Sequence, residues 1–212
     1  MPAKKQVGPR AQRKAQRPQE ILEAAFEEFV ERGYVATRVE DIASRVGVTK
    51  GTIYFYFDTK ERLFEEMIRH ISVPFADISA YARSLTGPYP ERLRKFLRLL
   101  YDLIVLDRNT RELLRFVITE GSRFPQVLDR HHEEFIAPMK EATRNLFEAA
   151  VAAGEFRDGP AIKIPDAAIG ATMMLSVMQM IFADRIPQDV DAFFEAHVDV
   201  ILHGLLAKDC AV

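Results

Sequence analysis

Residues 37–64 read TRVEDIASRVGVTKGTIYFYFDTKERLF, and they predict two short helices, a tight turn between them and the start of a third helix. We expect the first helix to begin at Thr37, whose hydroxyl can accept a first-turn backbone N–H, with Glu40 completing a capping box. Gly47 should end this helix, because glycine adopts the left-handed conformation without a Cβ penalty. This order of elements is a helix-turn-helix.

The second helix of the motif should run from Lys50 to Phe57, with Thr49 as its N-cap. Ile53 and Phe57 lie one turn apart and are expected to face the core. At roughly 100° per residue, the outward-facing residues are then Gly51, Thr52, Tyr54 and Phe55. Exposed aromatic side chains on so short a helix require a partner, and base edges and thymine methyl groups in a DNA major groove can supply one.

The third helix is expected to begin with Asp58 as its N-cap and Glu61 at the matching capping-box position. Lys60 then lies in a first turn, where a cation opposes the helix dipole. A DNA phosphate would resolve this conflict, because a helix N-terminus and an ammonium together form an anion site. The alternative is that Lys60 is a solvated surface lysine, but its place beside the helix-turn-helix favours the phosphate contact.

The motif resembles the DNA-binding domain of the TetR family of bacterial transcription regulators. The resemblance covers residues 18–65 and is carried by Ile42, Ala43, residues 47–54, Phe57, Lys60 and Glu61. It implies that the base-facing residues are Lys50, Gly51, Thr52 and Phe55. It also implies that the residues near the sugar-phosphate backbone are Tyr54, Tyr56 and Lys60.

One position departs from the pattern of the family. Many members carry Ser or Thr where this chain has Arg38, so we expect Thr37 to provide the cap. Arg38 is then free to reach a phosphate or the minor groove. Thr37 and Arg38 therefore join the expected DNA-binding set.

The composition is that of an ordinary globular protein, with 48% hydrophobic and 28% charged residues among 212. The single cysteine, Cys210, can form no internal disulfide, which fits a reducing compartment. The sequence shows no apolar run near the roughly 20 residues that span a bilayer, and no signal peptide. We therefore expect a cytoplasmic protein without membrane contact.

The net charge of −2 conceals an asymmetry along the chain. Residues 1–62 contain 12 Lys and Arg against 9 Asp and Glu, a net charge of +3, which leaves −5 for the remainder. Six basic residues precede the first acidic one: Lys4, Lys5, Arg10, Arg13, Lys14 and Arg17. This arm can neutralise DNA phosphates and add salt-dependent affinity, or it can be a disordered solubilising tail.

We expect three parts in the chain: a basic flexible arm over residues 1–17, a helix-turn-helix domain over 18–65, and an effector-binding and dimerisation domain over 66–212. An opening helix over 17–32, with Pro18 in its first turn and Gly33 as its stop, completes the DNA-binding domain.

The fold class is expected to be all-α, with about nine helices, because no segment of the sequence shows the pattern of a β-strand. After the helix that begins at Asp58 and meets Pro74, the expected helices cover 91–106, 109 or 110–120, 126–153 with an interruption at Pro138, 166–184 and 189–206. A loop is expected between Gly159 and Pro165.

The last two expected helices, 166–184 and 189–206, carry apolar residues around more than one face. A surface helix of a monomer would not expose so much apolar area, so a second copy of the chain should cover one face. The resulting homodimer would place its two helix-turn-helix motifs about 34 Å apart, or a small multiple of this, on a palindromic double-stranded DNA operator.

The family resemblance also implies a small-molecule cavity within residues 75–185, and release from DNA as the commoner response to the ligand. Candidates for an apolar lining are Phe116, Phe124, Phe135, Met139, Phe147, Met173, Met174 and Met178. Glu120 and His131 can orient a ligand, and the expected effector is apolar or aromatic. The competing interpretation is that each of these residues is ordinary core or surface.

An enzyme is not expected, and neither is a cofactor or a metal. The run His131–Glu134 suggests metal chemistry at first, but adjacent helical residues diverge by roughly 100° and the His-x-x-x-His spacing is absent. The alternative function is a ligand- or protein-binding module of the same fold that no longer binds DNA. The presence of Lys50, Thr52, Tyr54 and Lys60 argues against it.

Overall fold

The computed structural model describes residues 9–71, 78–182 and 185–206, with the backbone alone for residues 9–15. Within these ranges the chain is all-α, and it divides into two compact units over residues 1–73 and 74–212. None of the described helices combines the length and the apolar character that a membrane-spanning segment needs.

The described residues form eleven separate helical segments, two more than the nine expected. The additional segments are α5 (Ile78–Ser84) and α10 (Pro160–Lys163), the second of which lies where a loop was expected. These segments contain 7 and 4 residues, too few for a helical period to stand out in the sequence. The all-α class is therefore confirmed, whereas the helix count was too low.

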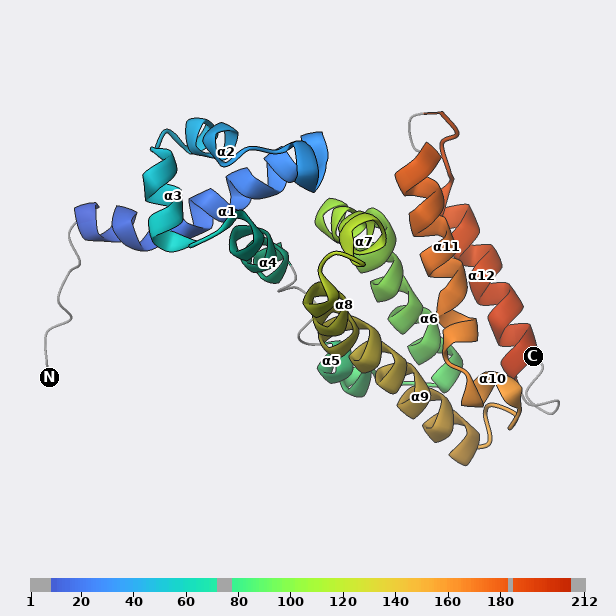
Figure 1. Cartoon of the computed structure of the whole chain (residues 1–212). Helices are drawn as coiled ribbons and strands as arrows, with labels where there is room; N and C mark the ends of the chain where they lie inside the picture. The colour runs from blue at the N-terminus through green and yellow to red at the C-terminus, as the bar shows by residue number, and fades with distance from the viewer. Residues whose placement is uncertain (1–8, 72–77, 183–184, 207–212) are drawn as a thin grey trace, which may run out of the picture. The chain divides into compact units, whose positions relative to one another are not determined.

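The first unit consists of α1 (Pro9–Ala36), α2 (Val39–Val46), α3 (Lys50–Tyr56) and α4 (Lys60–Ile71). The three shorter helices are arranged around α1 (Figure 1). Gly33 has φ 75° and interrupts α1, as expected of its stop residue. The helix begins before the expected arm ends, because the intervening Ala, Arg, Lys and Gln residues all favour helix.

α4 belongs to the first unit over its whole length, so the boundary between the units lies later than residue 65. Its inward residues are buried: Leu63, Phe64, Met67 and Ile68. They pack against α1, where Phe29, Tyr34 and Phe64 form an aromatic cluster with ring centres 5.0 to 5.6 Å apart. Pro74, which this helix was expected to meet, lies outside the described residues.

A buried carboxylate joins α1 to α2. Glu28 accepts a hydrogen bond from Nε of Arg45 at 2.8 Å and lies 3.3 Å from Nε of Arg32. Arg45 also binds Glu31 at 2.7 Å. Hydrogen bonds to Glu31 and Glu28 raise the pKa of Arg45, so this connection stays ionised.

Three helix starts differ from the predicted caps. Arg38 occupies the N-cap position of α2 in place of Thr37. Thr59 Oγ1 accepts the backbone N–H of Arg62 at 3.0 Å and caps α4 in place of Asp58. α7 (Arg108–Glu120) follows Asp107 as its N-cap and so begins earlier than the expected start at residue 109 or 110. At α4 and α7 several capping residues stand close together, and only the backbone conformation distinguishes them.

Two π-helical segments shape the second unit. α6 (Tyr89–Leu100) continues into η2 (Tyr101–Leu106), where Ile104 O accepts a hydrogen bond from Ser176 Oγ at 2.9 Å. α8 (Pro125–His131) continues through η3 (His132–Ile136) into α9 (Ala137–Ala152). The α-helical pattern is thus interrupted directly before Pro138, near the expected place, by a π-helical turn that accommodates a residue without an N–H and does not end the helix.

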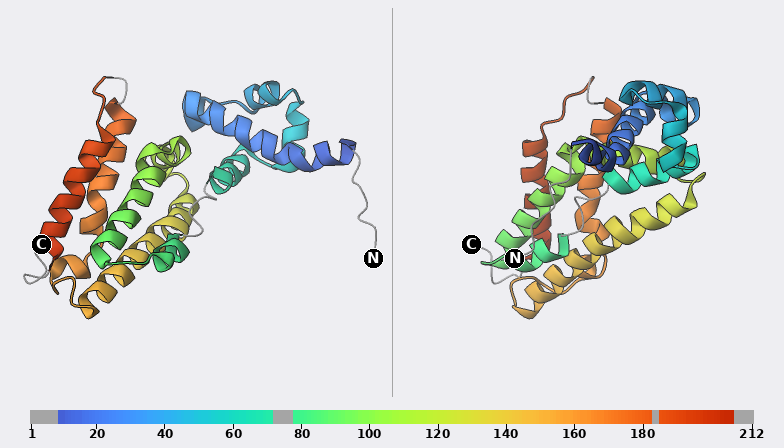
Figure 2. Two further views of the ribbon diagram at one scale, coloured as in Figure 1. Left: turned by 180° about the vertical axis from the view of Figure 1, so that it is seen from behind. Right: turned by 90° about the vertical axis from the view of Figure 1, so that its left-hand side faces the viewer.

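The last helices are α11 (Asp166–Phe182) and α12 (Val190–Leu205), which pack on each other and on α6 and η2 (Figures 1 and 2). Arg98 binds Asp191 at 2.5 Å and Arg94 pairs with Glu195, both between α6 and α12. These contacts hold α12 on the unit by one face and leave its other faces accessible.

Candidate DNA interface and ligand cavity

The helix α3 presents its predicted outward face to solvent. Thr49 caps the helix by accepting the backbone N–H of Thr52 at 3.2 Å, and Gly47 precedes it with φ 72°. Ile53 and Phe57 are buried, as expected, whereas Phe55 is 73% exposed. The outward face therefore consists of Gly51 and Phe55, with the half-buried Thr52 and Tyr54 beside them.

The ammonium of Lys50 has two neighbours within the chain. It lies 2.7 Å from Oε1 of Glu40 in the first turn of α2. It also lies 5.5 Å from the ring centre of Tyr54. The position of Lys50 beside the exposed face of α3 agrees with a base-facing role, but neither neighbour could be inferred from helical spacing.

Tyr56 and Lys60 lie beside this face. The Tyr56 ring packs edge-on against Phe55 with 5.1 Å between ring centres. The Lys60 ammonium lies 4.5 Å from the ring centre of Tyr34 and donates to the carbonyl of Val35 at 3.4 Å. Lys60 is thus held between α4 and the end of α1, which differs from the freely solvated lysine of the alternative interpretation.

Thr37 does not reach the candidate interface. Its side chain is buried, and its hydroxyl donates to the carbonyls of Glu28 at 3.0 Å and Gly33 at 2.8 Å. The predicted capping box with Glu40 is therefore wrong, because the hydroxyl turns back towards α1. Arg38 is exposed, so it remains available for a backbone contact.

The basic arm is described only in part. Lys4 and Lys5 lie outside the described residues, and Arg10, Arg13 and Lys14 are described as backbone of α1 alone. Arg17 pairs with Glu20 at 2.7 Å. A DNA contact by this arm stays a prediction.

A small apolar cavity lies in the second unit, between η2, α7, the α8–η3–α9 helix and α11. It is lined by Ile104, Thr110, Leu114, His131, Phe135, Ile136, Met139 and Met173. Its volume is about 30 Å³. Ligand pockets occupy roughly 300–1,000 Å³, so this cavity has to widen before it can hold an organic ligand.

Some of the ligand residues expected from the sequence line this cavity, and others do not. His131, Phe135, Met139 and Met173 line it. The remaining candidates lie elsewhere: Phe116, Glu120, Phe124, Phe147, Met174 and Met178. Phe116, Phe124 and Phe147 are buried as ordinary core, while Met174 is exposed on α11. The lining residues that the sequence analysis did not single out are Ile104, Thr110, Leu114 and Ile136, whose side chains are typical of any helix.

His131 is the only titratable side chain of the cavity lining. Its Nδ1 is buried without a hydrogen-bond partner, and its ring stacks on Phe135 at 5.0 Å. Burial, with a smaller contribution from His132, lowers the pKa of His131 to about 4. The imidazole is therefore neutral at physiological pH and offers a ligand a hydrogen bond without a charge.

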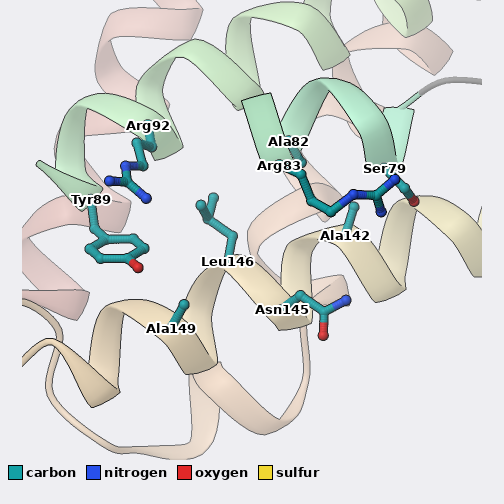
Figure 3. Close-up of a pocket in the computed structure, with 9 residues that line it drawn as sticks. All are labelled: Ser79, Ala82, Arg83, Tyr89, Arg92, Ala142, Asn145, Leu146 and Ala149. Atoms are coloured by element: carbon teal, nitrogen blue, oxygen red, sulfur yellow. The ribbon is translucent and has the colours of Figure 1, made fainter. Parts of the chain in front are cut away.

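A second, more open hollow lies between α5, α6 and α9 (Figure 3) and has a volume of about 150 Å³. Figure 3 shows Leu146 in its middle, with Tyr89 and Arg92 on one side and Arg83 on the other. Arg92 lies over the Tyr89 ring at 4.4 Å and donates to the carbonyl of Gly87 at 2.6 Å. The basic rim distinguishes this hollow from the uncharged cavity.

Large apolar side chains are exposed on the last two helices. Met174 and Ile181 on α11 and Val200 on α12 are each more than half exposed. Both helices are otherwise held on the unit by buried contacts, among them the hydrogen bond between Tyr101 and His197 at 2.9 Å. The exposed side chains therefore lie on faces that no described part of the second unit covers.

Comparison with known families agrees with this division of the chain. The first unit matches the family described as bacterial regulatory proteins, TetR family, over residues 21–67. The second unit matches the AefR-like transcriptional repressor C-terminal domain over residues 91–202. Together the two matches span most of the chain, and each falls on one of the two units.

Individual relatives support the same assignment. The HTH-type transcriptional repressor NicS of Pseudomonas putida is 29% identical over 157 residues, which are 73% of this chain and 72% of NicS. The HTH-type transcriptional regulator TtgR, also of Pseudomonas putida, is 32% identical over 95 residues, 44% of this chain and 45% of TtgR.

Solved structures share the fold. A transcriptional regulator from Saccharomonospora viridis in complex with choline has a TM-score of 0.75 at 22% identity, over 92% of this chain and 100% of that chain. The regulator FadR of Bacillus subtilis in complex with stearoyl-CoA has a TM-score of 0.67 at 19% identity, over 88% and 98%. The two bound molecules differ in size and charge, so the fold does not determine the ligand.

The buried imidazole predicts a loss of stability in mild acid. The folded pKa of His131, about 4, lies below its ordinary 6.5, so the unfolded chain binds the proton first as the pH falls. The contribution of His131 to the free energy of unfolding should be fully present above pH 6.5. It should be lost as the pH falls towards 4, which lowers the free energy of unfolding by up to about 3 kcal/mol. Burial also lowers the pKa of His197, which adds to the loss.

Urea unfolding followed by circular dichroism at pH 7.5 and 5.0 measures this dependence. His131→Gln should remove part of it, whereas His132→Gln, at the exposed neighbouring position, should retain most of it. An unchanged pH dependence in His131→Gln would show that the imidazole is not buried in the neutral form.

Proposed function

The chain belongs to the TetR family of DNA-binding bacterial transcription regulators, and we propose that it is a homodimeric repressor that a small apolar effector releases from a palindromic operator. The observation that carries the proposal is the exposed face of α3, where Phe55 projects from a helix whose opposite face is fully buried. This face falls within the family match over residues 21–67.

The proposed DNA contacts follow from position and exposure. Lys50, Gly51, Thr52 and Phe55 are the proposed base-facing residues, and Arg38, Tyr54, Tyr56 and Lys60 the proposed backbone contacts. Phe55 can contact thymine methyl groups and Lys50 can donate to guanine, whereas Lys60 binds any phosphate equally. Base contacts and backbone contacts should therefore respond differently to substitution.

Lys60→Ala should weaken binding several-fold to every DNA sequence and flatten the slope of log affinity against log salt by about one unit per protomer. Phe55→Ala should instead change the ranking of sequences. Fluorescence anisotropy with labelled duplexes at several salt concentrations measures both effects. Lys163→Ala, at an exposed site in the second unit, is the control and should alter neither. Altered sequence ranking without a change in salt slope for Lys60→Ala would contradict its backbone role.

We propose that α11 and α12 form the homodimer interface with the same helices of a second copy. The support is the set of exposed apolar side chains on these helices, since two-fold symmetry lets one such patch cover itself. Dimerisation provides the second helix-turn-helix that a palindromic site requires.

Ile181→Glu should disrupt this dimer, because each two-fold contact would place a carboxylate in an apolar interface. Light scattering after size exclusion should show a shift towards monomer, and operator affinity should fall at least ten-fold. Ile118→Glu is a matched control, since Ile118 is 58% exposed and Ile181 is 57% exposed. A fully dimeric Ile181→Glu protein would exclude α11 from the interface.

We propose that the effector enters the small cavity around His131, Phe135 and Met139. No lining side chain carries a charge at neutral pH, because the imidazole of His131 is neutral there. An uncharged lining favours an uncharged apolar compound over a cation such as choline. Flexible methionines on two of its walls can yield as the cavity widens. An effector that binds the widened form more tightly than the DNA-bound form would release the operator, because this difference in binding free energy is the coupling between the two sites.

A further inference from the structure

The Lys50–Glu40 pair lies within the proposed reading surface. Lys50 is the only basic residue of α3, and its ammonium is 2.7 Å from the carboxylate of Glu40. Their hydrogen bond lowers the pKa of Glu40 and raises that of Lys50, so both groups are charged at neutral pH. The cation of the recognition helix is therefore already engaged by the chain before DNA arrives.

The pair is poorly suited to stabilising the fold. The side chains of Lys50 and Glu40 are 48% and 57% exposed, and exposed ion pairs contribute little because both groups remain hydrated. Near DNA the same pair has larger consequences. A carboxylate beside the ammonium cancels much of its attraction for phosphates and adds a negative charge of its own.

We propose that Glu40 is a specificity-determining residue that restrains Lys50 on non-operator DNA. A lysine without this neighbour would bind any nearby phosphate and strengthen binding to all sequences. With Glu40 in place, Lys50 gains from leaving the pair only where a guanine presents its N7 and O6 acceptors in the groove. Glu40 therefore weakens binding to random DNA more than binding to the operator, which widens the difference between them.

This inference rests on the proposed DNA interface, and a pair of charge-matched variants tests it. Glu40→Gln removes the negative charge and keeps the size of the side chain. Glu31→Gln removes the same charge from the same unit: Glu31 is 49% exposed and also lies 2.7 Å from a cation, Arg45, but the pair joins α1 to α2. Thermal melting should confirm that both variants fold.

The two probes are a random-sequence 30-base-pair duplex and the duplex that the wild-type protein selects from a random library. For Glu40→Gln we expect about ten-fold tighter binding to the random duplex at low salt, and at most about three-fold tighter binding to the selected duplex. The salt slope on the random duplex should steepen by about one unit per protomer. Glu31→Gln should leave the ratio of the two affinities within about two-fold of wild type.

Three results would overturn the inference alone: an unchanged affinity ratio in Glu40→Gln, an equal change in Glu31→Gln, or weaker binding of Glu40→Gln to the selected duplex only. The last would mean that Glu40 accepts a hydrogen bond from a base such as cytosine. If the folded wild-type protein binds neither duplex at low salt, the proposed function fails together with the inference.

Discussion

The rotation of α3 about its own axis is fixed by the complete burial of Ile53. A helix of seven residues can bury only one face, so a single apolar anchor determines which side chains face solvent. Gly47, in its left-handed conformation, sets the direction in which the chain enters this helix. The candidate reading face, with Phe55 at its centre, follows from these two constraints.

Much of the first unit could be predicted from the sequence because its signals are local. The glycine turn, the Thr49 cap and the burial of Ile53 and Phe57 all follow from spacings of four residues or fewer. Contacts between distant residues could not be predicted in this way. The Thr37 hydroxyl bonds to the carbonyl of Glu28, nine residues away, and the partners of Lys50 and Lys60 depend on how separate helices pack.

The second unit was less predictable, because its cavity draws residues from several helices. A sequence pattern identifies large apolar residues on α7 or α11, but it cannot distinguish Phe116 in the core from Met173 at the cavity. The π-helical turns η2 and η3 both contribute to the cavity wall and leave no sequence signature of their own. Such segments are often found at functional sites, which agrees with a ligand entering between them.

The central claim is that two copies of α3 read one palindromic site. Hydroxyl-radical footprinting of the wild-type protein on the duplex it selects tests this claim most directly. The account predicts two protected clusters of sugar-phosphate backbone on one face of the duplex, which flank major grooves separated by about 34 Å or a small multiple of it. Uniform protection along the duplex, or a single protected cluster at saturating protein, would contradict it.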